Sequence, residues 1–503
     1  MRPTISTAMI APDRDNASKY LRWLASGTLL LVYASVAYRL ASFPNQWLGA
    51  LIALCIGVIA ILVIGQRHLA LLTALVVAIP LVGFDFSLYF NQKLGGDYRI
   101  AMSLLDLALL GLWFKYMLTV PREQRQPLQP RALKWFMIGL FLLAALSLNV
   151  AKEADRTLFE LLRFFRMMML VWITAKSVPN PAALKHLVMV LFAMTILESF
   201  LSFGQKFSGG QLGITLLGEP DKVLSQELNT GDTAIRPGGT FGHANQFARF
   251  LGLVLPLALA VTIAAQNKKY RLLSSATLVI GGGALVATLS RGAWIGVVLG
   301  SGLVFAIMIM QSALRARALQ SLKLIALLVI PFVLINIGTF IARFTSADEG
   351  SFATREPMAR IAMKIIQDHP WGIGYGNYRL WLPRYGDPAV PFTFQAKVHN
   401  MYLLVAAELG VVSLLVLLGL FSLVFYYGFT LAKNAAPDSA MVAAGLIGGL
   451  LAFMIHCLVD YEEIGRVPIL WFYVALICAI TRLHQKSSGI QNTTPCTVIL
   501  GKN

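Results

Sequence analysis

Apolar runs of about 20 residues recur along almost the whole chain, beginning with Leu21–Leu40 and Trp47–Gly65. A helix of about 20 residues crosses the hydrocarbon core of a bilayer, where every backbone polar group must be hydrogen-bonded within the protein. A transmembrane β-barrel would need strands of alternating hydrophobicity, and no such alternation occurs. The pattern predicts an all-α polytopic membrane protein with about 12–14 transmembrane helices.

Composition supports this class and argues against a nucleic-acid partner. The chain is 57% hydrophobic and only 13% charged, whereas a soluble domain carries roughly 25% charged residues. The net charge of +18 lies partly in short connections such as Gln266–Leu272, as expected of signals that orient a membrane protein. The four cysteines are too few and too scattered for a disulfide framework. Membrane lipids are the surroundings that this composition requires.

Two long polar stretches, 205–242 and 342–398, interrupt the apolar segments. Because Lys and Arg accumulate in cytoplasmic connections, the basic short connections place both termini in the cytoplasm and both long stretches outside. The expected regions are a cytoplasmic N-terminal segment (1–20), N-terminal transmembrane helices (21–204), an outer loop (205–242), central transmembrane helices (243–341), a large outer loop (342–398), C-terminal transmembrane helices (399–482) and a cytoplasmic tail (483–503).

The large outer loop carries more basic than acidic residues, including Arg355 and Arg360. This excess runs against the orientation rule, so an anionic substrate explains it better than topology does. Apolar residues recur at helical spacing over Thr354–Gln367, which predicts an amphipathic helix at the surface. Its apolar face comprises Met358, Ile361, Ala362 and Ile365. The following His369-Pro370 ends this helix, and the glycines at 372, 374 and 376 predict a tight turn.

Three arginines lie where charge is costly. Arg291 stands between two apolar segments, at the beginning of the second, where free backbone N–H groups favour an anion. Its guanidinium is suited to bidentate phosphate binding. Arg163 and Arg166 share one helical face near the outer end of their segment. They form an anion site there, or alternatively reach the interface or pair with Glu160.

The run IRPGGTFGHANQFAR, from Ile235 to Arg249, combines Arg236, a proline-glycine turn and His243 at the start of the next helix. Glycines let the backbone approach a ligand closely. The alternative is a turn followed by an ordinary N-terminal helix cap. We therefore treat Arg236 and His243 as candidate substrate-binding residues.

His399 opens an apolar segment beside Asn400 and Tyr402, immediately after the outer loop. A histidine in that setting is suited to proton abstraction near neutral pH. The seven histidines show no metal-ligand spacing, so no metal site is expected. No motif in the sequence indicates a cofactor, so none is expected.

Isolated carboxylates in the apolar segments have simpler expected roles. Asp106 lies seven residues after Arg99, so a helix-stabilising ion pair between them is the default. Glu198 and Glu408 are expected to neutralise or position arginines. None of the three is expected to be a catalyst.

Four motifs together resemble the O-antigen ligase / Wzy polymerase superfamily. They are RPGGTFGHANQFARFL, TLSRGAWIGV, MKIIQDHPWGIGYGNY and VHNMYLLVAAELGVV, and they cover roughly 235–412. The resemblance implies a membrane glycosyltransferase of the GT-C type in the bacterial inner membrane, with its active site facing the periplasm. Such an enzyme moves a glycan from undecaprenyl pyrophosphate to an acceptor hydroxyl with inversion, without a metal or nucleotide sugar.

By matching motif, the resemblance implies His399 as general base and Arg291 as a diphosphate ligand, assisted by a loop arginine. The acceptor is lipid A–core in ligases, another lipid-linked repeat unit in polymerases, and a protein side chain in related oligosaccharyltransferases. We rank ligase first. The alternative from another class is a transporter or flippase for a lipid-linked sugar, which would also need buried arginines.

Overall fold

A computed structural model describes residues 57–59, 68–81, 85–90, 99–121, 127–214, 224–227, 233–335, 355–386 and 397–487, with a few single residues between these ranges. The predicted segments Leu21–Leu40 and Trp47–Gly65 lie outside the described residues, apart from positions 57–59. The same holds for residues 342–354 and 387–396 of the large loop and for the end of the chain beyond 487.

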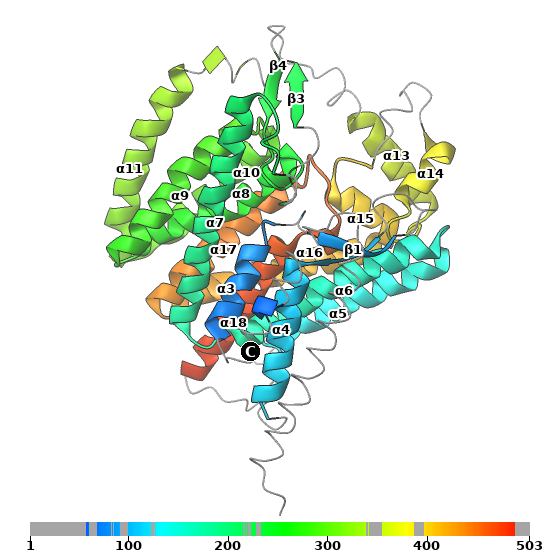
Figure 1. Cartoon of the computed structure of the whole chain (residues 1–503), viewed down its shortest axis with the longest axis horizontal. Coiled ribbons are helices and arrows are strands. Elements are labelled where there is room, and N and C mark those ends of the chain that lie inside the picture. The colour runs from blue at the N-terminus through cyan, green and yellow to red at the C-terminus, as the bar shows by residue number, and fades with distance from the viewer. Residues whose placement is uncertain are drawn as a thin grey trace, which may run out of the picture.

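The described elements follow one another as helices, interrupted by two short hairpins (Figure 1). In chain order they are α3 (His68–Ala78), β1 (Asp85–Phe90), β2 (Arg99–Ser103), α4 (Leu104–Thr119), α5 (Arg131–Leu146), a 3₁₀ turn (Ser147–Val150), α6 (Ala154–Ser177), α7 (Pro181–Ser208), β3 (Leu224–Glu227), β4 (Thr233–Arg236), α8 (Ala244–Ala264), α9 (Lys268–Ala287), α10 (Arg291–Met310), α11 (Ser312–Ile335), α13 (Arg355–Asp368), α14 (Tyr378–Tyr385), α15 (Met401–Leu409), α16 (Val411–Asn434), α17 (Pro437–His456), a second 3₁₀ turn (Ile464–Arg466) and α18 (Pro468–Ser487).

The predicted all-α polytopic class is confirmed. Eight described helices are long and apolar enough to cross a membrane: α5 with its 3₁₀ turn, α7, α8, α9, α10, α16, α17 and α18. The two antiparallel hairpins, β1–β2 and β3–β4, are small additions to this helical fold. The total of 12–14 crossings stays a prediction, because two of the predicted segments lie almost wholly outside the described residues.

Three helices form the centre of the bundle. More than three-quarters of the apolar window is buried in α8, α17 and α18, whereas at most half is buried in the other five candidate spans. The outer five expose large apolar side chains such as Val279, Val298 and Leu415. A helix that is apolar all round belongs in the interior, and an exposed apolar face belongs against lipid.

Small residues bring α10 against α17. At Gly300, a Cβ atom would lie only 2.3 Å from the Gly448 carbonyl oxygen, so a larger side chain would force the helices apart. Small residues at such crossings allow close backbone approach in membrane proteins. This contact fixes the beginning of α10, which is Arg291, relative to the end of α17, which is His456.

The large outer loop has its own small core. The predicted amphipathic helix is α13, and its four predicted apolar residues, Met358, Ile361, Ala362 and Ile365, are all buried. They pack in one cluster with residues of α14 and α15, including Tyr378 and Leu404. The helices α13 and α14 lie at the upper right of the molecule in Figure 1, at the same end as the β3–β4 hairpin. The predictions of a surface helix and of its buried face are confirmed.

The apolar segment predicted over His399–Phe429 is two helices, α15 and α16, rather than one. They meet at Gly410, which has φ +90° and lies so close to Trp371 that a Cβ atom would be 2.7 Å from the Trp371 carbonyl carbon. The Val411 N–H donates to the Pro370 carbonyl at 3.0 Å. The turn after α13 therefore occupies the space that a continuous helix would need, and glycine tolerates the resulting backbone.

The expectation that Arg99 and Asp106 lie on one face of the same helix is wrong. Arg99 lies in strand β2, and the helix begins only at Leu104. Asp106 instead completes a capping box with Ser103 at the start of α4, and its Oδ2 lies 3.2 Å from Arg166 Nη1. A serine followed three residues later by an acid is a typical helix start, and it explains the shorter helix.

Candidate active site

His399 is held at the entrance to α15 by contacts with the end of α17. The Met401 N–H donates to the Cys457 carbonyl at 3.0 Å, and Asn400 Nδ2 donates to the Leu458 carbonyl at 3.0 Å. The Asn400 side chain also caps α15 by accepting from the Leu403 N–H. Tyr402 donates its hydroxyl proton to the Met454 carbonyl at 2.9 Å. Asn400 and Tyr402, predicted as substrate-binding residues, thus anchor the start of α15, just after His399.

Asp460 is the polar partner of His399. The His399 Nδ1 and Asp460 Oδ1 atoms lie 3.3 Å apart, and the ring of Tyr461 stands edge-on at 5.4 Å from the imidazole. The His399 side chain is 29% exposed, whereas Asp460 is buried. A proton on Nδ1 facing the carboxylate leaves Nε2 as the acceptor. One nitrogen is therefore oriented by the protein, and the other is available to a substrate.

Asp460 stays ionised despite its burial. Burial alone raises the pKa of a carboxyl group, but the hydrogen bond of His399 and the positive charge of Arg249 act in the opposite direction and hold the pKa of Asp460 well below its usual range. Arg249 Nη2 lies 2.8 Å from Asp460 Oδ2. The same guanidinium contacts Glu462 and donates to the Tyr461 carbonyl. Arg249 thus fixes the whole turn that carries Asp460.

The α9–α10 junction packs directly beneath this turn. A Cβ atom at Gly292 would lie 2.4 Å from a Val459 methyl group and 3.0 Å from His456 Cδ2. Ser290 Oγ lies 3.4 Å from His456 Nε2, and that nitrogen lies 3.8 Å from Asp460 Oδ2. Arg291, the first residue of α10, therefore begins its helix at the Asp460 turn.

Arg236 and His243 approach the same place from the second outer stretch. Arg236 donates through Nε to the Thr288 carbonyl at 2.9 Å and through Nη2 to Asn245 Oδ1 at 2.8 Å. His243 caps α8, and its Nδ1 accepts from the Asn245 N–H at 3.1 Å. His243 lies close enough to Asp460 and His399 to interact with both electrostatically. The helix predicted to start at this histidine is α8, and His243 itself is its N-cap.

The two predicted loop arginines have different positions. Arg355, at the start of α13, lies close enough to His456 to act on its charge, as does Arg236. Arg360 is 58% exposed on the other side of α13, where Nη1 pairs with Glu356 at 2.7 Å. The structure therefore brings Arg355 toward the Asp460 turn and does not bring Arg360 there by any described contact.

Arg163 and Arg166 have carboxylate partners along α6. Arg163 Nη1 lies 2.6 Å from Glu160 Oε1, the alternative already recognised in the sequence, and Arg166 pairs with Asp106. Glu160 is fully buried and also lies 2.5 Å from Arg466 Nη2. No described contact joins these two arginines to His399. Their role as substrate ligands stays a prediction.

A buried ion-pair cluster lies beside the site, two residues before His399. Lys397 contacts Glu463 and lies 3.9 Å from Glu408 Oε1, and Glu463 also contacts Arg466. Burial raises the pKa of Glu463, but the charges of Lys397 and Arg466 outweigh it and lower that pKa to about 2. Burial lowers the pKa of Lys397, but its acidic neighbours raise it above its usual value. Both groups are therefore charged at neutral pH.

Glu198 and Glu408 hold backbone rather than arginines. Glu198 accepts from the Thr240 N–H at 3.0 Å and from the Thr240 hydroxyl at 2.8 Å, which fixes the turn before His243. Glu408 accepts from the Gly376 and Tyr378 N–H groups, which fixes the glycine turn after α13. The expectation that they neutralise arginines is wrong within the described residues. That glycine turn is itself confirmed, since Gly372, Gly374 and Gly376 all have positive φ.

Sequence reasoning missed the turn 459–466, which supplies Asp460. A signal was present: VDYEEIGR carries three acids between two apolar segments, and acids there have no role in orientation. The reason that Asp460 escaped notice is its distance of 61 residues from His399 in sequence. No group of three or more metal-ligating side chains occurs in the part of the chain that the structure describes.

Comparison with known proteins agrees with the motif resemblance. Residues 276–418, less than a third of the chain, match a family described as O-Antigen ligase, and this match confirms the resemblance to the O-antigen ligase / Wzy superfamily. No curated protein matches the chain. A solved structure from work titled "Structural coordination of polymerization and crosslinking by a peptidoglycan synthase complex" contains a chain 17% identical to this one, with a TM-score of 0.38. The alignment covers 70% of this chain and 97% of that chain.

Proposed function

We propose that this multi-pass membrane protein, which resembles the O-antigen ligases, transfers a glycan from a polyprenyl pyrophosphate carrier to an acceptor hydroxyl. The observation that carries the proposal is the pairing of partly exposed His399 with buried Asp460, beside arginines that come from three other parts of the chain. The O-antigen ligase match over 276–418 includes both Arg291 and His399. The donor would be undecaprenyl pyrophosphate carrying the glycan.

His399 acts as the general base in this proposal. Its Nε2 takes the proton from the acceptor hydroxyl while the acceptor oxygen attacks the anomeric carbon from the side opposite the leaving group, so the configuration inverts. The bond from the anomeric carbon to the pyrophosphate oxygen breaks, and the carrier leaves as its pyrophosphate. Asp460 holds the ring orientation and stabilises the imidazolium that forms, as carboxylates do in histidine-containing catalytic sites.

Arg291 is the proposed ligand of the departing pyrophosphate, with Arg355 and Arg236 adding positive charge nearby. Stabilising charge that develops in the transition state is commonly the largest contribution to catalysis. A pyrophosphate is a good leaving group once its charge is neutralised, so the reaction needs no general acid. Arg163, Arg166, Arg360 and His243 are further proposed contacts along the glycan and its carrier.

Lipid A–core is the acceptor that we propose, which makes the protein an O-antigen ligase working at the periplasmic face of the inner membrane. A polymerase would use another lipid-linked repeat unit, and an oligosaccharyltransferase would use a protein side chain. Product analysis after deleting the chromosomal copy separates the three activities. Loss of polymer on lipid A–core, with polymer still accumulating on its carrier, is the result expected of a ligase.

Asp460→Asn is expected to slow transfer by about tenfold to hundredfold, which is part of the roughly 10²–10⁴-fold that a positioned general base contributes. The amide keeps the size of the carboxylate but lacks the charge that stabilises an imidazolium. We expect the loss in kcat with little change in the KM for the lipid-linked donor, measured with purified protein. Asp368→Asn is the matched control, because Asp368 is an exposed acid of the same outer loop that bonds Tyr385. An unchanged kcat would remove Asp460 from the mechanism.

Arg291→Ala is expected to raise the KM for the lipid-linked donor and lower kcat, and Arg291→Lys is expected to restore only part of the activity. A lysine keeps the charge but cannot form the two parallel hydrogen bonds of a guanidinium. Donor titrations with both variants measure the effect. Arg384→Ala, which removes an exposed arginine of α14, is the control. Full activity of Arg291→Lys would indicate that Arg291 only anchors the helix end.

A further inference from the structure

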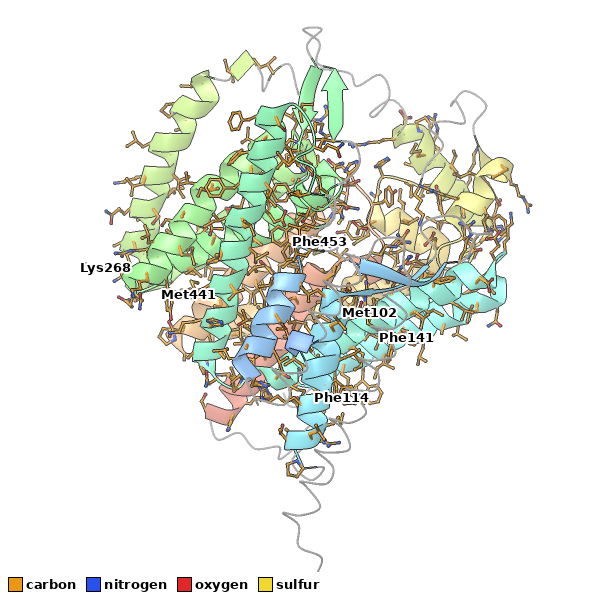
Figure 2. The ribbon with its side chains drawn as sticks, in the orientation of Figure 1. Met102, Phe114, Phe141, Lys268, Met441 and Phe453 are labelled. Carbon is orange, nitrogen blue, oxygen red and sulfur yellow. The ribbon has the colours of Figure 1, made fainter. Side chains whose placement is uncertain are left out.

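A second group of cations lies at the opposite end of the bundle from His399. It comprises Lys115 of α4, Lys134 of α5, Lys176 of α6 and Arg482 of α18. Arg482 is 14 residues beyond Pro468, the first residue of α18, so it lies about 20 Å along the axis of α18 from the active-site turn. Phe114, the neighbour of Lys115, is labelled in Figure 2 on the lower part of α4, away from α13 and α14.

The four cations surround the last turn of α6. Arg482 Nη2 donates to the Val178 carbonyl, and His68 contacts the Ser177 carbonyl. Lys115 is close enough to His68 to act on its charge, and Lys176 is similarly close to Arg482 and Lys134. The helices α4, α5, α6 and α18 therefore bring four positive charges to one place.

Four buried polar atoms of α4, α6 and α18 have no hydrogen-bond partner among the described residues. They are Lys115 Nζ, Thr174 Oγ1, Ser177 Oγ and Arg482 Nε. Lys115 is 7% exposed, and Thr174 and Ser177 are buried on the same face of α6. Buried polar groups in proteins are nearly always hydrogen-bonded, and an unpaired buried ammonium is especially costly. All four are N–H or O–H groups that can donate a hydrogen bond to a phosphate oxygen.

No described carboxylate balances this charge. The acid at this end of the described bundle, Asp438, already pairs with Lys185 at 2.8 Å. Cations that orient a membrane protein normally stand in exposed connections, as Lys268 does at the beginning of α9 (Figure 2). Lys115 instead lies within a helix and is buried. Orientation alone therefore does not explain the cluster.

We propose that Lys115, Lys176 and Arg482, with the Ser177 hydroxyl, form a binding site for the phosphate group of an anionic ligand. A phosphate would supply acceptors to the Lys115 ammonium and the Arg482 Nε–H, and would neutralise the cluster. Basic sites between transmembrane helices are suited to the head groups of anionic phospholipids. The neighbouring Trp135 favours this source, because it is 60% exposed and Lys134 lies 4.3 Å from its ring, as expected of an aromatic residue at a membrane interface.

Titration of the purified full-length chain with phosphatidylglycerol, phosphatidylcholine or inorganic phosphate tests the proposal. Bound lipid is counted by native mass spectrometry, and the melting temperature is followed in parallel. We expect phosphatidylglycerol to bind and to raise the melting temperature, and phosphatidylcholine to do neither. Lys115→Met/Arg482→Gln is expected to weaken phosphatidylglycerol binding about tenfold or more, as expected for lost charge-assisted hydrogen bonds. Lys268→Gln, which removes an exposed cation, should bind it normally.

The unpaired ammonium gives a second, independent readout. Without anionic lipid, Lys115→Met should melt at or above the wild-type temperature, because it removes an uncompensated buried charge. With phosphatidylglycerol, the wild type should gain more than the variant. If inorganic phosphate alone stabilises the wild type but not the double variant, the result would support a phosphate site whose ligand is soluble rather than a lipid. If the double variant does not fold, Lys134→Gln/Lys176→Gln replaces it. Equal phosphatidylglycerol binding by wild type and variant would overturn the proposal.

Discussion

Replacing His399 with alanine is expected to slow glycan transfer by about 10²–10⁴-fold, because the acceptor hydroxyl loses the base that takes its proton. The effect should fall on kcat, since the proposed pyrophosphate ligands remain in place. The measurement is the rate of transfer from purified lipid-linked donor per mole of protein, in membranes or after reconstitution. His399→Gln keeps a polar side chain of similar size and should be equally impaired.

His369→Ala is the matched control for this loss. His369 belongs to the same outer loop, but it follows the end of α13 and stacks edge-on with Trp381 at 4.6 Å. We expect that variant to transfer glycan at close to the wild-type rate. Melting temperatures of both variants show whether they are folded. Normal transfer by a folded His399→Ala protein would contradict the assignment of the base.

Replacing Lys397 with methionine is expected to destabilise the folded protein by about 3–5 kcal/mol, the usual cost of removing one partner from a buried ion pair. Lys397 is 5% exposed, and it is the cation shared by Glu463 and Glu408. Without it, two buried carboxylates lose the cation that they share, although Glu463 still contacts Arg466. The measurement is the loss of melting temperature in detergent, and Lys364→Met, an exposed lysine of α13, is the control.

A second substitution separates the ion pair from lost packing. Glu463 contacts both Lys397 and Arg466. Because Lys397→Met leaves Glu463 with only one of these two cations, Lys397→Met/Glu463→Gln should recover part of the stability that Lys397→Met loses. A melting temperature for Lys397→Met equal to that of the wild type would mean that the cluster contributes nothing to holding the outer loop against α6 and α18.

Local patterns in the sequence predicted what depends on local periodicity. The apolar face of α13 follows from the spacing of Met358 to Ile365, and the start of α8 directly after His243 follows from the place of this residue before an apolar run. The grouping of Arg236, His243, Arg355 and His399 also agrees with the structure, because the predicted topology puts all four at one end of the bundle.

What the sequence did not predict depends on contacts between distant segments. Asp460 meets His399 only because α15 is tied to the end of α17. Likewise, Gly410 ends α15 because the turn after α13 packs against it. Glu198 and Glu408 looked like counter-charges for arginines, but backbone N–H groups satisfy them. The pattern of apolar and polar residues along one helix does not show which distant loop packs against the end of that helix.

Product analysis in proteoliposomes is the most direct test of the proposed activity. The purified protein is supplied with undecaprenyl pyrophosphate-linked glycan and lipid A–core, and both the glycan-bearing acceptor and the released carrier are measured. We predict that the wild type forms a new glycosidic bond and releases undecaprenyl pyrophosphate in equal amount, and that His399→Ala does neither. Movement of the lipid-linked glycan across the bilayer, with no glycosidic bond formed, would contradict the account and favour a transporter.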